Sequence, residues 1–193
     1  MTGSYKLILY FRGVPSDTML EQARELSREA CREVLVELRQ RGWNIITAES
    51  VTAGLISARL VDIPMFGGCV YGGFVVYDTE AKRRMLGVEQ ADVYTEAAAG
   101  EMAVGALRNS GAKVAVSATG NAGPVDDVER LGVVDIGCAI RASNSPFVRT
   151  ARYKLIDPDS SSSTNVRELI RELTVSAAAD HVLTTIREFS LDV

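Results

Sequence analysis

The sequence predicts an α/β fold of three layers, α/β/α, with a mixed, mostly parallel sheet in a single domain. Three observations lead to this prediction. Amphipathic helical patterns alternate with short apolar segments along most of the chain. Polar residues stand where several of these apolar segments pass into helices, as at Ser50 and Asp78. A length of 193 residues, with 47% hydrophobic and 24% charged residues, is usual for one globular domain.

Helix boundaries are clearest in the first long helix. Thr18 and Glu21 form a capping-box pattern at its start, and Gly42 follows a last turn that contains Arg39 and Arg41. The predicted helices are 18–41, 52–60, 79–86 and 95–108, with a last helix that begins at 165. The predicted strands are 43–48, 69–77 and 114–118, followed by an antiparallel pair at 133–141 and 147–154. Residues 5–11 fit either an added edge strand or a contact arm.

Charge and cysteine content limit the class of partner. The net charge is −4 and the lysines and arginines are spread along the chain, so we expect no nucleic-acid partner. A pocket for one phosphate stays open. No apolar run has the length of a membrane span, so we expect no membrane partner. Cys31, Cys69 and Cys138 lie far apart and no signal-peptide pattern is present, which predicts a cytoplasmic protein with reduced thiols.

Ser50 is the first candidate site residue, because it follows a buried apolar strand at the expected start of a helix. A serine in this position is often only the N-cap of the helix. The same position also suits a nucleophile, because free N–H groups of the following turn can hold an oxyanion or a phosphate. Thr52 fits either a second cap or a ligand contact.

Lys82 and Tyr77 form a second candidate pair at the next strand-to-helix junction. If Asp78 caps this helix, Lys82 lies in its first turn, where the helix dipole and burial both lower the pKa of an amine. Two other interpretations stay open at this point. Lys82 fits a surface lysine whose amine reaches solvent, and Tyr77 fits an aromatic ring that seals the end of the sheet.

Three segments of the chain resemble, in order, the motifs of the CinA carboxy-terminal domain, the nicotinamide mononucleotide amidohydrolases. They read Ala48-Glu49-Ser50-Val51-Thr52-Ala53-Gly54, then Gly72-Gly73-Phe74-Val75-Val76-Tyr77-Asp78-Thr79-Glu80-Ala81-Lys82, then Thr119-Gly120-Asn121-Ala122-Gly123-Pro124. The resemblance covers about residues 19 to 190. It implies the same three-layer architecture, a domain over residues 17–193 after an amino-terminal extension of residues 1–16, and a homo-oligomer.

The resemblance also implies roles for single residues. Ser50 would be the nucleophile, and Lys82 with Tyr77 would handle its proton during hydrolysis of the nicotinamide carboxamide. Backbone N–H groups around Ser50 and Val51 would stabilise the oxyanion. Arg167 also fits a solvated cation in the first turn of the last helix. The residues expected to bind the nucleotide substrate are Val51, Thr52, Thr119, Gly120, Gly123 and Arg167.

Several positions depart from the family motifs. Val51 replaces a cysteine and Ala53 replaces a glycine, which are small changes in size. The departures in the ligand-contacting loops are Asp78, Thr79, Asn121 and residues 125–127. They leave two other functions open: a non-catalytic homologue that binds a nucleotide or a partner, and a hydrolase of another small amide.

Other catalytic patterns are absent from the sequence. It contains no Walker, Rossmann, H-E-x-x-H or G-x-S-x-G motif, and we expect neither a cofactor nor a metal. Ser110 and Lys113 match S-x-x-K only across a predicted helix end and glycine turn. The acidic residues of 126–129 fit a solvated loop better than a cation site. His181, the only histidine, falls on the apolar side of the last helix, which argues against a Ser-His-Asp triad.

Overall fold

The computed structural model describes residues 6–7, 16–124, 126–156 and 165–191. Its strands are β1 (Lys6–Leu7), β2 (Ile45–Glu49), β3 (Val70–Val75), β4 (Val114–Gly120), β5 (Val133–Ile140) and β6 (Phe147–Lys154). Its helices are α1 (Asp17–Arg41), α2 (Leu55–Val61), α3 (Thr79–Leu86), α4 (Glu96–Arg108) and α5 (Val166–Leu191). Two short 3-10 turns, η1 (Gly67–Cys69) and η2 (Val128–Arg130), complete the described elements. This confirms the predicted α/β class.

The strands form one mixed sheet in the order β1-β6-β5-β4-β2-β3. β2 pairs in parallel with both β3 and β4, and β1 pairs in parallel with β6. β5 runs antiparallel to both β4 and β6, which confirms the predicted antiparallel pair. Because β2, β3 and β4 run in the same direction, the loops that follow them leave the same end of the sheet. Most of the residues predicted for the site lie at this end of the sheet, whereas Lys82 belongs to α3 and Arg167 to α5.

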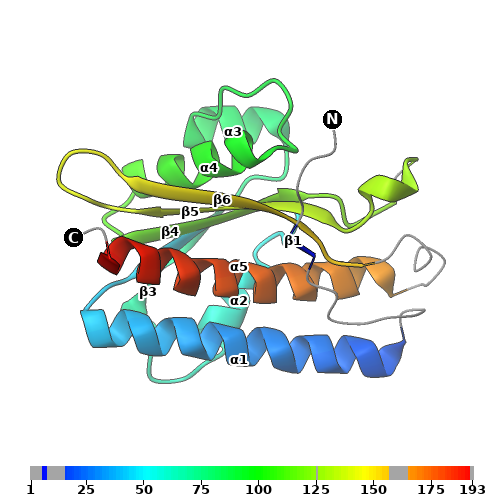
Figure 1. Cartoon of the computed structure of the whole chain (residues 1–193), viewed down its shortest axis with the longest axis horizontal. Helices are drawn as coiled ribbons and strands as arrows, with labels where there is room; N and C mark the ends of the chain where they lie inside the picture. The colour runs from blue at the N-terminus through cyan, green and yellow to red at the C-terminus, as the bar shows by residue number, and fades with distance from the viewer. Residues whose placement is uncertain (1–5, 8–15, 125, 157–164, 192–193) are drawn as a thin grey trace.

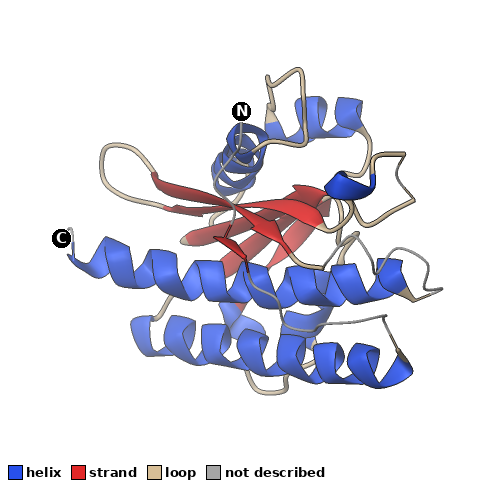
Figure 2. Ribbon diagram, turned by 45° about the vertical axis from the view of Figure 1, so that its right-hand side comes forward, coloured by secondary structure: helices blue, strands red, loops and turns tan. Residues whose placement is uncertain are grey.

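Helices cover both faces of the sheet, as Figures 1 and 2 show. α4 lies on one face with α3 beside it, and α5, α2 and α1 lie on the other. On the α5 face the core is built from fully buried aliphatic side chains such as Leu35, Ile136 and Ile170. On the α4 face Met102 and Leu86 pack among alanines. Each large aliphatic side chain buried in this way contributes roughly 1.5–3 kcal/mol to folding.

The start of α1 differs from its prediction. Ser16 is the N-cap, because its Oγ accepts a hydrogen bond from the Met19 N–H at 3.3 Å. Thr18 therefore lies inside the first turn, and the predicted capping box with Glu21 is wrong. Asp17 stands in the first turn, where the helix dipole favours an acid. The predicted end is confirmed: Gly42 has φ 65° and its N–H donates to the Arg39 and Leu38 carbonyls.

The segment after β2 also differs from its prediction. α2 begins at Leu55 instead of residue 52, because Ala53 and Gly54 have φ values of 51° and 95°, which no α-helix contains. β3 ends at Val75, two residues before the predicted end. α3 and α4 begin at Thr79 and Glu96 with the expected caps.

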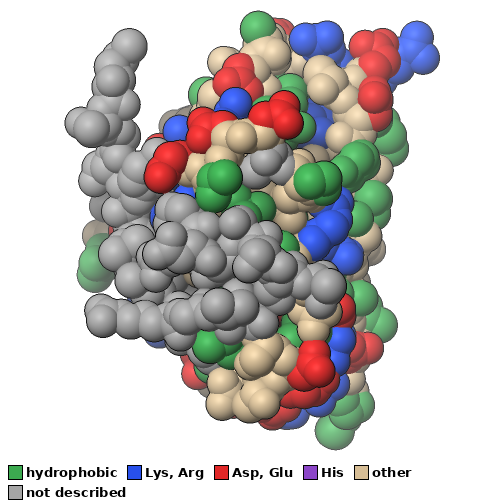
Figure 3. Space-filling model, turned by 90° about the vertical axis from the view of Figure 1, so that its right-hand side faces the viewer, with side chains coloured by type: hydrophobic (Ala, Val, Ile, Leu, Met, Phe, Trp, Pro, Cys, Tyr) green, Lys and Arg blue, Asp and Glu red, His purple; other side chains and the backbone are tan. Residues whose placement is uncertain are grey.

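Part of the predicted amino-terminal strand forms β1, which pairs with Tyr153 and Lys154 at the edge of the sheet. The rest of residues 5–11 lies outside the described residues, as does Val125. Among the described helices, none combines the length and the apolar character that a membrane crossing requires. Figure 3, which views the molecule from the right-hand end of Figure 1, shows basic and acidic side chains mixed over the visible surface.

Candidate active site

The loops after β2, β3 and β4 surround a cavity of about 140 Å³. Residues from all three loops line it, together with one residue from the start of α5 and one that precedes α4. The lining residues are Ser50, Val51, Tyr77, Tyr94, Gly120, Asn121, Ala122, Gly123, Pro124 and Arg167. The structure thus brings together Ser50, Val51, Tyr77, Gly120, Gly123 and Arg167 from the residues that the sequence predicted.

Ser50 lies immediately after β2 and is 5% exposed. It is not a helix N-cap, because Gly54 occupies that position at the start of α2. Its backbone N–H donates to the Ala118 carbonyl at 3.0 Å, so the expectation that this N–H helps to hold an oxyanion is wrong. Its hydroxyl forms no hydrogen bond with any described residue. The hydroxyl is therefore available to a ligand in the cavity.

The next backbone N–H groups are better placed as oxyanion donors. Those of Val51 and Thr52 have no hydrogen-bond acceptor within the described part of the chain. They belong to the turn between β2 and α2, which the positive φ angles of Ala53 and Gly54 keep out of helical geometry. A turn with unpaired N–H groups beside a serine can bind a developing negative charge.

Glu49 is a structural residue of this junction whose role the sequence reasoning missed. Its carboxylate is fully buried and accepts hydrogen bonds from the backbone N–H groups of Ile56 and Ser57 at 3.0 and 2.9 Å. The hydroxyls of Thr47 and Ser57 donate to it at 2.9 and 2.7 Å. Glu49 therefore caps α2 from the end of β2. An acidic residue at the end of an apolar strand was the available signal.

Gly73 on β3 lies against this carboxylate network. A Cβ atom at Gly73 would collide with the hydroxyls of Thr47 and Ser57. The glycine of the second motif therefore has a packing reason, because only a residue without a side chain leaves room for the Glu49 network.

Lys82 lies in the first turn of α3 and is only 2% exposed. Its Nζ donates to the Tyr77 carbonyl at 2.8 Å. Burial lowers the pKa of its amine, while the nearby Asp78 carboxylate acts in the opposite direction. The net direction agrees with the sequence expectation, and the surface-lysine interpretation is wrong. Lys82 is not among the cavity-lining residues, and no hydrogen bond joins it to Ser50 within the described structure.

Tyr77 and Arg167 meet at the mouth of the cavity. Tyr77 is 64% exposed, so it does not seal the end of the sheet. The Arg167 guanidinium donates to the Tyr77 hydroxyl at 3.4 Å and to the Gly123 carbonyl. Arg167 is exposed in the first turn of α5, as the solvated-cation interpretation expects, and it also contacts two of the three loops.

Thr119 and Thr52 lie behind the cavity wall, and both are fully buried. The Thr119 hydroxyl donates to the Val93 carbonyl at 2.9 Å, so this threonine has a structural role that requires no ligand. The Thr52 hydroxyl is buried without a hydrogen-bond partner among the described atoms. Neither side chain reaches the cavity lining.

The loop after β4 approaches the cavity through its backbone. Gly120 has φ 151°, and a Cβ atom there would lie 2.5 Å from the Val133 carbonyl oxygen, so only glycine fits. Asn121 lines the cavity, and its backbone is fixed by two hydrogen bonds: its N–H donates to the Val133 carbonyl, and its carbonyl accepts from the Gly132 N–H. Tyr94 also lines it, and no local pattern in the sequence marks that tyrosine.

A second cavity of about 290 Å³ adjoins the first and is lined mainly by apolar side chains. The two share Ala122, Gly123, Pro124 and Arg167. Among the described residues, no group of His, Cys, Asp and Glu has the arrangement of a metal site. Asp127 caps η2, with its carboxylate accepting from the Glu129 N–H. His181 is buried between Tyr153 and the Arg149 carbonyl, as expected for a core histidine.

Comparison with known proteins identifies the family. The model of the "CinA C-terminal domain" family matches residues 27–186. A CinA-like protein of Chloroherpeton thalassium is 38% identical over 148 residues, which are 70% of this chain and 35% of that protein. A putative competence-damage inducible protein of Caldicellulosiruptor saccharolyticus is 37% identical over 60% of this chain and 30% of its own length. The chain thus spans about a third of these curated relatives.

Solved structures show the same fold. The competence/damage inducible protein CihA from Agrobacterium tumefaciens is 28% identical, with a TM-score of 0.72 over 91% of this chain and 99% of that one. A CinA superfamily protein from Escherichia coli, at 23% identity, has a TM-score of 0.64 over 90% of this chain and 94% of its own, which supports the fold alone. The chain therefore belongs to the CinA C-terminal domain family.

Proposed function

We propose that this protein is an amidohydrolase that converts nicotinamide mononucleotide and water to nicotinate mononucleotide and ammonia. The observation that carries the proposal is the Ser50 hydroxyl, which belongs to a cavity-lining residue and has no hydrogen bond to any described residue. It is flanked by unpaired N–H groups, and a buried lysine with a lowered pKa stands at the neighbouring junction. These are the parts that an activated serine requires.

In the proposed reaction the Ser50 oxygen attacks the carboxamide carbon while its proton passes to the Tyr77 and Lys82 pair. The N–H groups of Val51 and Thr52 stabilise the oxyanion that forms. The same proton then moves to the leaving nitrogen, and ammonia departs from the acyl-enzyme. A water molecule attacks the ester, the acid is released, and Ser50 regains its proton. A lysine suits the base, because a desolvated amine can be neutral, which arginine cannot.

The position of Arg167 supports a nucleotide as the substrate. Arg167 stands where the two cavities meet, so a phosphate in either cavity would find a guanidinium within the site. Asp78, an acidic departure from the family motif, caps α3: its carboxylate accepts a hydrogen bond from the Glu80 N–H at 2.7 Å. The departure at this position therefore has a structural role as the N-cap of α3.

Purified protein tests the proposal directly. With nicotinamide mononucleotide we expect equal amounts of ammonia and nicotinate mononucleotide, measured by an enzyme-coupled ammonia assay and by chromatography. Ser50→Ala should lose turnover and keep binding of the nucleotide in calorimetry. Ser143→Ala, at an exposed residue between β5 and β6, is the matched control and should behave as wild type.

The alternative function is that of a non-catalytic homologue that binds a nucleotide or a partner. Asn121 favours it, because this cavity-lining residue replaces an apolar residue of the family motif. Binding of nicotinamide mononucleotide without release of ammonia would support this alternative and refute the amidohydrolase. Turnover of another small amide, found with a panel of amides and the same ammonia assay, would keep the chemistry and change the substrate.

Two further expectations belong to the proposal. We propose a homo-oligomer, and a monomeric mass in light scattering would refute it. We also propose a cytoplasmic location, which is supported by Cys31, Cys69 and Cys138, all free and buried. The proposed hydrolysis requires no cofactor, and its partner is the small-molecule nucleotide.

A further inference from the structure

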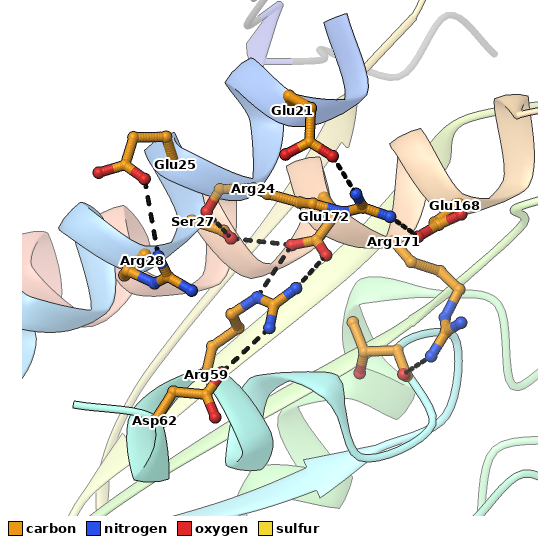
Figure 4. Close-up of polar contacts among 11 residues, drawn as sticks. Glu21, Arg24, Glu25, Ser27, Arg28, Arg59, Asp62, Glu168, Arg171 and Glu172 are labelled. Carbon is orange, nitrogen blue, oxygen red and sulfur yellow. Dashed lines mark hydrogen bonds and ion pairs between the residues drawn. The ribbon is translucent and has the colours of Figure 1, made fainter. Parts of the chain in front are cut away.

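The first two turns of α5 contact all three loops of the site. Arg167 donates to the Gly123 carbonyl after β4 and to the Tyr77 hydroxyl after β3. Arg171, one turn further along α5, donates through Nη2 to the Thr52 carbonyl after β2 at 2.7 Å. Figure 4 shows Arg171 extending from α5 to this loop. One helix therefore holds three segments that are far apart in the sequence.

The loop that Arg171 contacts has an unusual backbone. Ala53 has φ 51°, a left-handed conformation that is disfavoured for every residue except glycine. Two long internal hydrogen bonds, Ala53 N–H to Ser50 and Leu55 N–H to Thr52, each of 3.2 Å, stabilise the turn. Gly54 offers no side chain to cap α2. The turn therefore depends on contacts from outside it.

Arg171 is the only side chain, among the described residues, that forms a hydrogen bond with the backbone of residues 50–54. Its bond fixes the carbonyl of the peptide that joins Thr52 to Ala53. The unpaired Thr52 N–H belongs to the preceding peptide, which joins Val51 to Thr52. Because the two planar peptides meet at the Thr52 Cα atom, fixing the orientation of one restricts the orientation of the other. Arg171 does not line either cavity, and it can act on a substrate only through this loop.

Glu172, the residue after Arg171, joins α5 to α1 and α2. Glu172 is 2% exposed and accepts from Arg59 of α2 at 2.5 Å and from Ser27 of α1 at 2.8 Å. Figure 4 shows this carboxylate between the two partners, beside Arg171. α2 follows the Ser50 turn directly, so α5 is joined to the turn itself through Arg171 and to the helix after it through the Glu172–Arg59 contact.

We infer that Arg171 is a positioning residue, which holds the Ser50–Gly54 turn so that its unpaired N–H groups face the reacting carbonyl. The inference rests on the proposed function for its catalytic part. A turn that shifts by about 1 Å loses much of the rate that orientation supplies, of the order of 10²-fold. Substrate binding should be nearly unaffected, because Arg171 makes no contact with the cavities.

Three variants test the inference: Arg171→Ala, Arg171→Lys and the control Arg187→Ala, an exposed arginine on the same helix. For Arg171→Ala we expect kcat for nicotinamide mononucleotide to fall about 10- to 100-fold with KM within about threefold of wild type. Arg171→Lys should recover part of kcat, because an ammonium also donates to a carbonyl. Arg187→Ala should retain the kcat of the wild type.

Hydrogen exchange provides a readout that needs no turnover. In Arg171→Ala, a peptide over residues 49–56 should exchange faster, since the hydrogen bonds of Ala53 and Leu55 lose their support. The inference is overturned by unchanged exchange, by kcat within about twofold of wild type, or by an effect on KM alone. A wild type without turnover would refute the proposed function, and the exchange result would still decide whether Arg171 holds the turn. If Arg171→Ala melts too early to assay, Arg171→Lys carries the same comparison.

Discussion

The chain passes from strand to helix twice beside the cavity, at β2 to α2 and at β3 to α3, and the two junctions are capped differently. At the second junction Asp78 caps α3 from the adjacent position, with an exposed carboxylate on the Glu80 N–H. At the first junction the cap of α2 comes from Glu49, six residues before Leu55, and is fully buried.

The difference decides where the free backbone donors lie. A local cap such as Asp78 accepts from the Glu80 N–H and keeps the chain helical from the next residue, so N–H groups left without an acceptor belong to the first turn of α3 itself. The remote cap at Glu49 satisfies the first turn of α2 and leaves residues 51–54 outside the helix. The N–H groups of Val51 and Thr52 remain free beside Ser50. In the proposed reaction the first junction provides Ser50 with these N–H donors, and the second provides the amine of Lys82.

The largest expected effect follows from removing that amine. Lys82→Met should lower kcat/KM about 10²- to 10⁴-fold, the range usual for loss of a general base. Lys82→Arg should be as impaired, because a guanidinium stays charged at any working pH. Steady-state kinetics with the ammonia assay measures both. Activity in Lys82→Met within about tenfold of wild type would show that the two junctions do not cooperate in catalysis.

The pH dependence of Lys82 gives a second readout of the same variant. Burial puts the pKa of this amine below its ordinary value of 10.5, so the unfolded chain binds more protons than the folded one between these two pKa values. The stability of the wild type should rise with pH in that window. Lys82→Met should therefore gain stability over wild type below the folded pKa, and this advantage should shrink as pH approaches 10.5. Urea unfolding at several pH values tests the sign.

A smaller effect, on stability, distinguishes the buried cap from the exposed one. Glu49→Ala leaves the N–H groups of Ile56 and Ser57 buried without an acceptor, which should cost about 3 kcal/mol or more. Glu33→Ala, at an exposed position of α1, is the control and should change stability by about 0.5 kcal/mol or less. The measurement is urea unfolding at pH 7. A loss of stability for Glu49→Ala no larger than that of the control would show that Glu49 does not stabilise α2 as a cap.

The same contrast explains what could be predicted from the sequence. The helix α3 was predictable in full, because Asp78, Lys82 and Gly87 act on neighbours within one or two turns. The start of α2 was not, because its cap lies in the preceding strand and no spacing rule links the two. The start of α1 was predicted at Thr18 from the capping-box spacing to Glu21, whereas the structure places the N-cap at Ser16.

The site was predictable where it depends on the ends of parallel strands. Ser50, Tyr77 and Gly120 share one end of the sheet because β2, β3 and β4 run in the same direction. The contacts of Arg167 and Arg171 were not predictable, since α5 reaches loops that precede it by 44 to 119 residues. The engagement of the Ser50 N–H by Ala118 also depends on sheet register, which periodicity alone does not fix.

The smallest expected effect concerns Asp78 and separates its two roles at the second junction. Asp78→Ala removes an exposed N-cap and should cost about 1 kcal/mol, whereas Asp78→Asn keeps a side-chain acceptor and should cost less. Both variants remove a carboxylate that raises the pKa of Lys82. The ascending limb of kcat/KM against pH should therefore move to lower pH in both, although Asp78→Ala should lose more stability than Asp78→Asn. If the limb moves only in Asp78→Ala, the shift comes from fraying of α3 and not from the charge.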